Sequence, residues 1–152
     1  MVRDYSAVLS RIDSLIEDEN DLIALMATVV CELHNEFKEF HWTGFYRVTS
    51  PGLLKIGPYQ GTHGCLEISF DRGVCGACAS SKMTQLVPNV HDREDHIACS
   101  SSTLSEIVVP MLDQDGEVIA VLDIDSDNLA EFDEHDQRNL ESICALISSK
   151  IR

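Results

Sequence analysis

The sequence predicts an α+β fold built around a central antiparallel sheet. Apolar residues recur at the three- and four-residue spacing of an amphipathic helix over residues 4–18, and they do so again after Asp133. The middle of the chain holds short segments rich in β-branched residues. Two of these segments are joined by Asp-Gln-Asp-Gly at residues 113–116, which is typical of a hairpin turn. Helices at both ends of a run of antiparallel strands indicate this fold class.

Four helices are expected in all. The first covers residues 4–18, and the second follows Asn20, a residue type that favours the N-cap position. The second helix is apolar on more than one side, which predicts that it is well buried. A short helix is expected at residues 76–82, where small residues cluster. The last helix opens at Asp133, whose negative charge suits a helix N-terminus.

Six strands are expected between these helices. They are predicted at residues 42–48, 53–59, 66–70, 84–87, 105–112 and 117–124. The chain shows no internal repeat, linker or low-complexity segment. Together with the length of 152 residues, this predicts a single domain over residues 1–152.

Composition narrows the classes of function. The formal net charge of −15 argues against nucleic acid and against anionic membranes as partners. No stretch approaches the roughly 18 uninterrupted apolar residues of a membrane span. The N-terminal segment lacks the apolar core of a secretory signal, so we expect a cytoplasmic protein.

Six cysteines are the first indication of chemistry. Cys31 and Cys144 lie in apolar helical patterns, and we expect them to be buried, inert thiols. The remaining four, Cys65, Cys75, Cys78 and Cys99, cluster in a middle third that is rich in Gly, Ser and His. A cytosolic domain of this size does not need a disulfide framework, so these four have to be explained in another way.

Several interpretations of the four cysteines stay open on the residues alone. They are unrelated thiols, or a zinc site, since Cys75 and Cys78 have the spacing of a zinc knuckle. The same pair also has the spacing of a thioredoxin-like motif, which belongs in a βαβ setting. The last interpretation is a redox pair, in which one thiolate attacks and another resolves the product.

Within a redox pair, Cys99 has the better context for the attacking thiol. It follows a segment with Arg93 and two histidines, which favour a thiolate, and it precedes three serines. Cys65 follows the glycines at 61 and 64, which permit the backbone movement that a resolving thiol needs.

Acidic and aromatic side chains supply candidates for substrate binding. Asp123 and Asp125 are two apart and point to one face of a strand, and Glu106 lies on the strand before it in the chain. They form either a solvated face or a carboxylate cluster that holds an ammonium group. Trp42 and Tyr46 share a face of an earlier strand, where they form either core or an aromatic wall.

The chain resembles the free methionine-R-sulfoxide reductases, which are built on a GAF domain. The resemblance runs from about Trp42 to the last helix and rests on residues 42–46, 56–61, 72–76, 87–91, 96–99, 105–110 and 121–126. The spacing of Cys65, Cys75 and Cys99 separates this family from sensory GAF domains. Cys78 departs from the family pattern, because a small residue without a thiol is expected there.

The resemblance implies one GAF domain with a six-stranded antiparallel sheet, helices on one face and a loop-covered pocket on the other. It implies Cys99 as the nucleophile, Cys65 as the resolving thiol and Cys75 as an auxiliary thiol. Trp42 and Tyr46 would form the wall for the S-methyl group. The acidic trio of Glu106, Asp123 and Asp125 would bind the amino group and serve the sulfoxide oxygen.

The implied activity is the reduction of free methionine-R-sulfoxide, with thioredoxin or a similar dithiol restoring the enzyme. Neither a metal nor an organic cofactor is expected, and a homodimer is left open. The alternative is a GAF sensor that binds a small molecule without chemistry. The segment from Asn128 to Glu134 faintly resembles cyclic-nucleotide-binding GAF domains, but such sensors normally sit beside an output domain.

Overall fold

A computed structural model describes residues 2–94 and 102–151. Six strands form one sheet in the order β3-β2-β1-β6-β5-β4, and each neighbouring pair runs antiparallel. The strands are β1 Trp42–Ser50, β2 Leu53–Gln60, β3 Glu67–Ser69, β4 Gln85–Val87, β5 Ser105–Leu112 and β6 Val118–Ser126. The predicted α+β class and the six-stranded antiparallel sheet are therefore confirmed.

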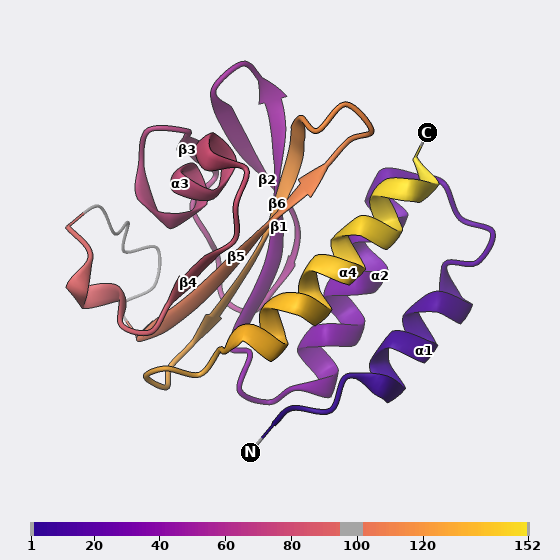
Figure 1. The fold of residues 1–152 in the computed structure, drawn as a ribbon, viewed down its shortest axis with the longest axis horizontal. Helices are drawn as coiled ribbons and strands as arrows, with labels where there is room; N and C mark the ends of the chain where they lie inside the picture. Colours follow the sequence, from indigo (N-terminus) through magenta and orange to yellow (C-terminus); the bar gives the residue numbers. More distant parts are fainter. Residues whose placement is uncertain (1, 95–101, 152) are drawn as a thin grey trace.

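Three helices cover one face of the sheet: α1 Ser6–Leu15, α2 Leu22–Glu36 and α4 Glu134–Lys150 (Figure 1). Their apolar sides pack on the side chains that alternate toward this face, such as Phe45 of β1, Ile107 of β5 and Leu122 of β6, which are fully buried. This layer is the main hydrophobic core. The predicted packing of the terminal helices on one face is confirmed.

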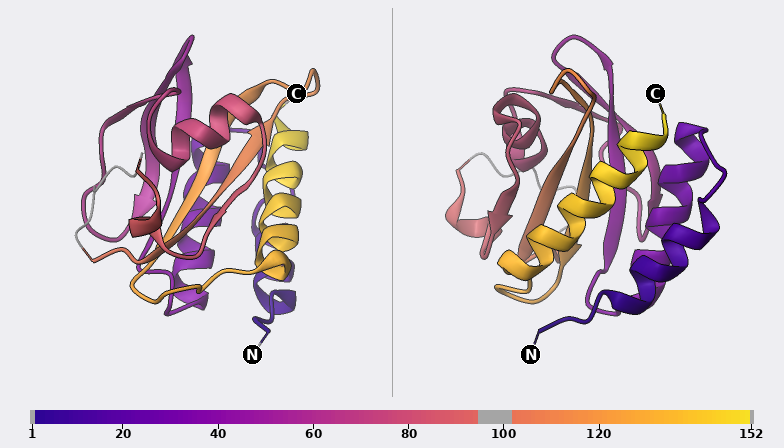
Figure 2. Two further views of the ribbon diagram at one scale, coloured as in Figure 1. Left: turned by 60° about the vertical axis from the view of Figure 1, so that its left-hand side comes forward. Right: turned by 45° about the vertical axis from the view of Figure 1, so that its right-hand side comes forward.

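The opposite face of the sheet holds a second, smaller core. Helix α3 Gly73–Ser81 lies over it, and the 3-10 turn η1 Val90–Asp92 follows β4 (Figure 2). Tyr46, Val108 and Val121 point into this core from three adjacent strands, and Cys75 and Cys78 reach it from α3. Successive side chains of a strand point to opposite faces of the sheet. The position of each functional candidate along β1, β5 or β6 therefore decides the face on which it lies.

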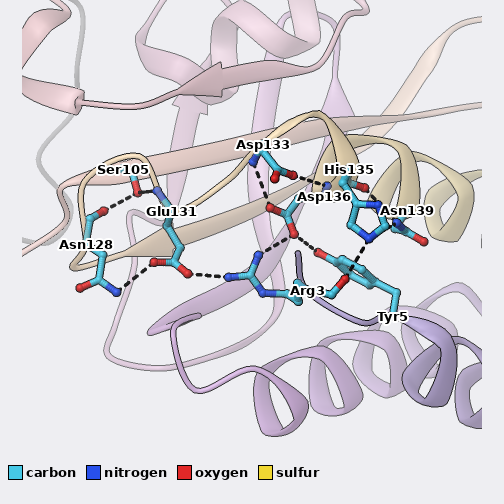
Figure 3. Close-up of polar contacts among 9 residues, drawn as sticks. All are labelled: Arg3, Tyr5, Ser105, Asn128, Glu131, Asp133, His135, Asp136 and Asn139. Atoms are coloured by element: carbon cyan, nitrogen blue, oxygen red, sulfur yellow. Dashed lines mark hydrogen bonds and ion pairs between the residues drawn. The ribbon is translucent and has the colours of Figure 1, made fainter. Parts of the chain in front are cut away.

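The N-terminal segment is tied to the start of α4 by a polar network (Figure 3). The Arg3 guanidinium bridges Asp136 and Glu131 at 2.5 Å each. It also lies over the ring of Phe40, 4.9 Å from its centroid. Tyr5 donates a hydrogen bond to Asp136 at 2.7 Å. These contacts fix the loop between β6 and α4, which begins directly after the acidic strand β6.

Helix boundaries correct several sequence expectations. The cap of α2 is Asp21, whose side chain accepts from the Ala24 amide, and not Asn20. The short helix α3 begins at Gly73, three residues before the predicted start. Gly73 has φ of +67°, a backbone conformation that glycine adopts readily and that a residue pattern does not show. Cys31 was expected to be buried but is exposed, because it lies on the solvent side of α2. None of the helices in residues 2–94 and 102–151 is long and apolar enough to cross a membrane.

Candidate active site

Strand register brings the acidic trio together on the face of the second core. Glu106 of β5 and Asp125 of β6 are direct cross-strand partners, so their side chains lie on the same face. Asp123 is two residues further along β6 and shares that face, opposite Val108. The sequence placed Asp123 and Asp125 together, and the register between β5 and β6 adds Glu106. The interpretation as a solvated face is wrong, because Glu106 and Asp123 are only 6% and 5% exposed.

Burial and mutual repulsion raise the pKa of all three carboxyl groups well above the usual range. For Glu106 the main cause is burial, followed by the charge of Asp123. For Asp123 it is burial, followed by Asp125, and for Asp125 it is burial, followed by Glu106. The trio therefore holds protons when it has no cationic partner. A cation that enters this place allows the carboxyl groups to ionise.

Cys75 belongs to the same cluster. Its thiol donates a hydrogen bond to Oδ2 of Asp123 at 3.4 Å. Burial raises the pKa of Cys75 well above normal, and the charges of Asp123 and Glu106 raise it further. A thiol in this environment stays protonated, which makes Cys75 a poor nucleophile and a hydrogen-bond donor instead. Among the described residues, the other oxygen of Asp123, Oδ1, has no hydrogen-bond partner.

Aromatic rings stand beside the acidic trio. Trp42 is the cross-strand partner of Asp125, and Tyr46 lies four residues along β1 on the same face. Their rings stack with centroids 5.9 Å apart and planes inclined by 23°. Tyr59 of β2 stacks on Trp42 from the other direction, at 5.4 Å. The site thus joins a flat apolar wall to buried carboxylates, although Trp42 and Tyr46 also contribute to the second core.

Two glycines make room for this wall. Gly64 was noted above only for the backbone movement that it permits beside Cys65, and Gly44 was not singled out. A Cβ atom at Gly44 would lie 2.5 Å from Cη2 of Trp42, so the indole ring occupies the space of a side chain. A Cβ atom at Gly64 would lie 2.9 Å from Cζ2 of Trp42 and 3.1 Å from the Tyr46 hydroxyl. A glycine inside a strand between two aromatic residues is the signal that could have indicated Gly44.

The loop after β2 brings Cys65 to the same side of the sheet. Trp42 donates its indole N–H to the carbonyl of Thr62 at 2.8 Å, which holds this loop against the wall. Cys65 is partly buried and disulfide-bonded. Cys99, the predicted nucleophile, lies outside the described residues.

The other described cysteines are free thiols: Cys31, Cys75, Cys78 and Cys144. Cys75 and Cys78 are both buried on α3, and burial raises the pKa of Cys78 as well. A thioredoxin-like pair needs an exposed thiol of lowered pKa in a βαβ unit, whereas the described strands pair only antiparallel. That interpretation of the pair is therefore wrong.

The structure relates Arg93 to the acidic trio, whereas its predicted contact with Cys99 lies outside the described residues. The sequence suggested that Arg93 supports the Cys99 thiolate. In the structure its positive charge acts on Glu106 and lowers the pKa of that carboxyl group, against the stronger effects of burial and of Asp123. Arg93 follows η1 directly, so this element aims it at the acidic trio.

Comparisons with known proteins agree with this geometry. The GAF domain family matches residues 21–151. The free methionine-R-sulfoxide reductase of Escherichia coli is 33% identical over 143 residues, which cover 93% of this chain and 86% of that protein. The structure of free methionine-R-sulfoxide reductase from Neisseria meningitidis in complex with its substrate is 41% identical and has a TM-score of 0.91. That match covers 99% of this chain and 92% of the other.

The chain belongs to the free methionine-R-sulfoxide reductases. It is therefore an oxidoreductase on a GAF fold. The free methionine-R-sulfoxide reductase (fRMsr) of Staphylococcus aureus, whose structure is a complex with substrate, is another member. It is 36% identical, with a TM-score of 0.92 and coverage of 100% of this chain and 98% of that one. Relatives that match nearly the whole chain are named reductases, which favours the enzyme interpretation over the sensor interpretation.

Proposed function

We propose that the chain reduces free methionine-R-sulfoxide to methionine, with Cys99 as the nucleophile and Cys65 as the resolving thiol. The observation that carries the proposal is the acidic trio beside the stacked rings of Trp42 and Tyr46. Glu106 and Asp123 of this trio are buried, and Asp125 is partly buried. The substrate has an ammonium group that suits the carboxylates and an S-methyl group that suits a flat apolar wall. Its sulfur lies between these two ends.

The chemistry proceeds in balanced steps. The thiolate of Cys99 attacks the sulfoxide sulfur, and a protonated carboxyl group of the trio gives its proton to the oxygen. The S–O bond of the substrate breaks as its protonated oxygen passes to the sulfur of Cys99. Methionine leaves, and Cys99 becomes a sulfenic acid. The thiol of Cys65 condenses with the sulfenic acid, which forms a disulfide and releases water. An external dithiol, which we take to be thioredoxin, then reduces this disulfide.

The raised pKa values explain how one cluster can both bind a cation and donate a proton. Three carboxyl groups this close cannot all ionise, so at least one keeps its proton at neutral pH. The incoming ammonium neutralises part of the remaining charge. Peptide-bound methionine sulfoxide has no free amine, so its binding would leave a buried carboxylate unpaired, which costs several kcal/mol.

Bonding states and burial support the division of roles among the thiols. Cys65 is disulfide-bonded, whereas Cys75 is a free thiol whose pKa is raised by burial. We assign Cys75 to holding Asp123 by its hydrogen bond, an auxiliary role at the pocket, and not to the attack on sulfur.

The test is turnover with free methionine-R-sulfoxide and thioredoxin. The wild type should form methionine from the R epimer and not from the S epimer. Cys99→Ser should form none, even with a strong chemical reductant. Cys65→Ser should release about one methionine per chain and then stop with thioredoxin, because attack does not need the resolving thiol. Mass spectrometry of the oxidised protein should show a Cys65–Cys99 peptide. A Cys75–Cys99 peptide in its place would move the resolving role to α3.

A further inference from the structure

We propose that Cys75, Glu106 and Asp123 form a binding site for one Zn²⁺ ion, which competes with the substrate's ammonium group and so inhibits the enzyme reversibly. The sulfur of Cys75 and one carboxylate oxygen each of Glu106 and Asp123 all lie within 4.8 Å of one another, and all three residues are buried. Competition with substrate rests on the proposed function, whereas metal binding stands on this geometry alone.

One pair of ligand atoms already has the spacing of a zinc site. A tetrahedral site with Zn–S and Zn–O bonds of about 2.3 and 2.1 Å has sulfur–oxygen edges of about 3.5 Å. Cys75 Sγ and Asp123 Oδ2 are 3.4 Å apart. The thiol proton now lies between these two atoms, and the metal ion takes the place of that proton. A rotation of the Glu106 carboxylate about its side-chain torsions brings the third ligand closer.

A second observation is that one buried oxygen of the cluster accepts no hydrogen bond. Asp123 is 5% exposed, and within the described part of the chain its Oδ1 accepts no hydrogen bond. A buried polar oxygen without a partner is costly, and a cation in the cluster removes that cost.

The ligand set selects the metal. Mg²⁺ and Ca²⁺ prefer six or more oxygen ligands and gain little from a thiolate. A thiolate with two carboxylates suits a borderline ion such as Zn²⁺, which is stable with three protein ligands and one open position. Binding displaces the protons of the thiol and the carboxyl groups, so the affinity should rise with pH. Cys78, one turn along α3, is not in the set, so this site differs from a Cys75-x2-Cys78 knuckle.

The binding test uses the oxidised protein, in which the Cys65 disulfide removes that thiol from competition. The exposed Cys31 is replaced by Ser in every sample, since it would bind zinc loosely. Titration calorimetry should find one strong Zn²⁺ site per chain. Cys75→Ser should weaken that site more than about 100-fold, because even the loss of an outer-shell partner costs 10–100-fold. The matched control Cys78→Ser should leave the affinity unchanged.

Spectroscopy identifies the ligand directly. Co²⁺ in place of Zn²⁺ should show a thiolate-to-metal charge-transfer band, which disappears in Cys75→Ser and persists in Cys78→Ser. If Cys75→Ser fails to fold, Asp123→Asn serves as the second variant and should also lose the tight site. Equal affinity in the Cys75→Ser and control proteins, or a cobalt spectrum without the band, overturns the proposal.

Competition is measured both by binding and by turnover. Free methionine, the reaction product with the same ammonium group, should weaken Zn²⁺ binding as its concentration rises, and Zn²⁺ should raise KM without changing kcat. If zinc binds through Cys75 and the protein shows no reductase activity, the proposed function fails and the metal site stands. If zinc binds and methionine does not displace it, the proposed overlap with the ammonium position is wrong.

Discussion

At the scale of single residues, the proposed role of the acidic trio is to select a substrate with a free ammonium group. Sites that bond a substrate polar group reject analogues that lack it by roughly 10⁴-fold. The wild type should therefore prefer free over N-acetylated methionine sulfoxide by a large factor in kcat/KM. Asp125→Asn should lower kcat/KM for the free amino acid strongly and narrow this preference. Equal activity of the wild type on both substrates would show that the carboxylates do not recognise the amine.

Burial of Asp123 also predicts a pH dependence of stability. Its pKa is raised in the folded protein, so between the unfolded value of about 4 and the folded value the native state binds more protons than the unfolded state. By linkage, this contribution to the free energy of unfolding is full at low pH and is lost as pH rises through the folded pKa. Each pH unit in this window costs about 1.4 kcal/mol.

Asp123→Asn removes that dependence because an amide does not titrate. Without substrate, the difference in melting temperature between Asp123→Asn and wild type should grow in favour of the variant from pH 5 to pH 8. Differential scanning calorimetry at matched ionic strength measures this difference. Titrating groups distant from Asp123 cancel in the comparison, whereas Glu106 and Cys75, whose pKa values its charge raises, contribute to it. If the melting temperatures of the two proteins change with pH in parallel, Asp123 is already ionised in the folded protein.

At the scale of elements, the start of α4 holds the loop that follows the acidic strand. Asp133 and Asp136 form a capping box, in which each side chain accepts a hydrogen bond from the other residue's backbone amide, both at 3.0 Å. Asp133→Ala should lower the free energy of unfolding by about 1 kcal/mol. The neighbouring Glu134→Ala is the control, since Glu134 is exposed and not the cap. Urea denaturation measures the free energy of unfolding of both variants. Equal losses would mean that both side chains act only through their charge near the helix dipole.

Most element positions follow from local patterns, and the departures have local causes. The strand predicted at residues 105–112 from its β-branched residues is confirmed by β5, which has the same bounds. Helix α3 began earlier than predicted, because Gly73 provides a positive φ that lets the chain turn into the helix. The predicted strand 66–70 is shortened to Glu67–Ser69 at the edge of the sheet, where only one neighbour pairs with it.

At the scale of the molecule, we infer that residues 1–152 form one cooperative unit. Helix α1 precedes the matched GAF residues 21–151, yet its Val8 and Ile12 are fully buried in the main core. Arg3 ties the N-terminal segment to α4 through two largely buried carboxylates, Asp136 and Glu131. Loss of these contacts should therefore lower the stability of the whole domain and not only of its N-terminal segment.

Arg3→Ala should lower the free energy of unfolding by about 3 kcal/mol. The reason is that the variant leaves the buried Asp136 without its cation. The control is Arg11→Ala, which removes a bridge to Glu32 and Glu36 that is exposed to solvent and should cost much less. Thermal unfolding should show one transition in each protein. A separate early transition in Arg3→Ala would show that the N-terminal segment unfolds independently of the sheet.

Local patterns in the chain were sufficient for the fold class, most strands and helices, and the shared face of Asp123 and Asp125. Periodicity in the sequence indicates such features because helices and strands place on one face the residues that are three, four or two positions apart. It could not report that Cys31 faces solvent or that Cys75 donates to Asp123, since these depend on packing between elements distant in the chain. Only the tertiary structure distinguishes a solvated acidic strand from a buried carboxylate cluster. In that structure, α3 and the register of β5 with β6 shield Glu106 and Asp123 from water. Because a buried carboxylate is poorly solvated, its pKa rises, and it either keeps a proton or binds a cation.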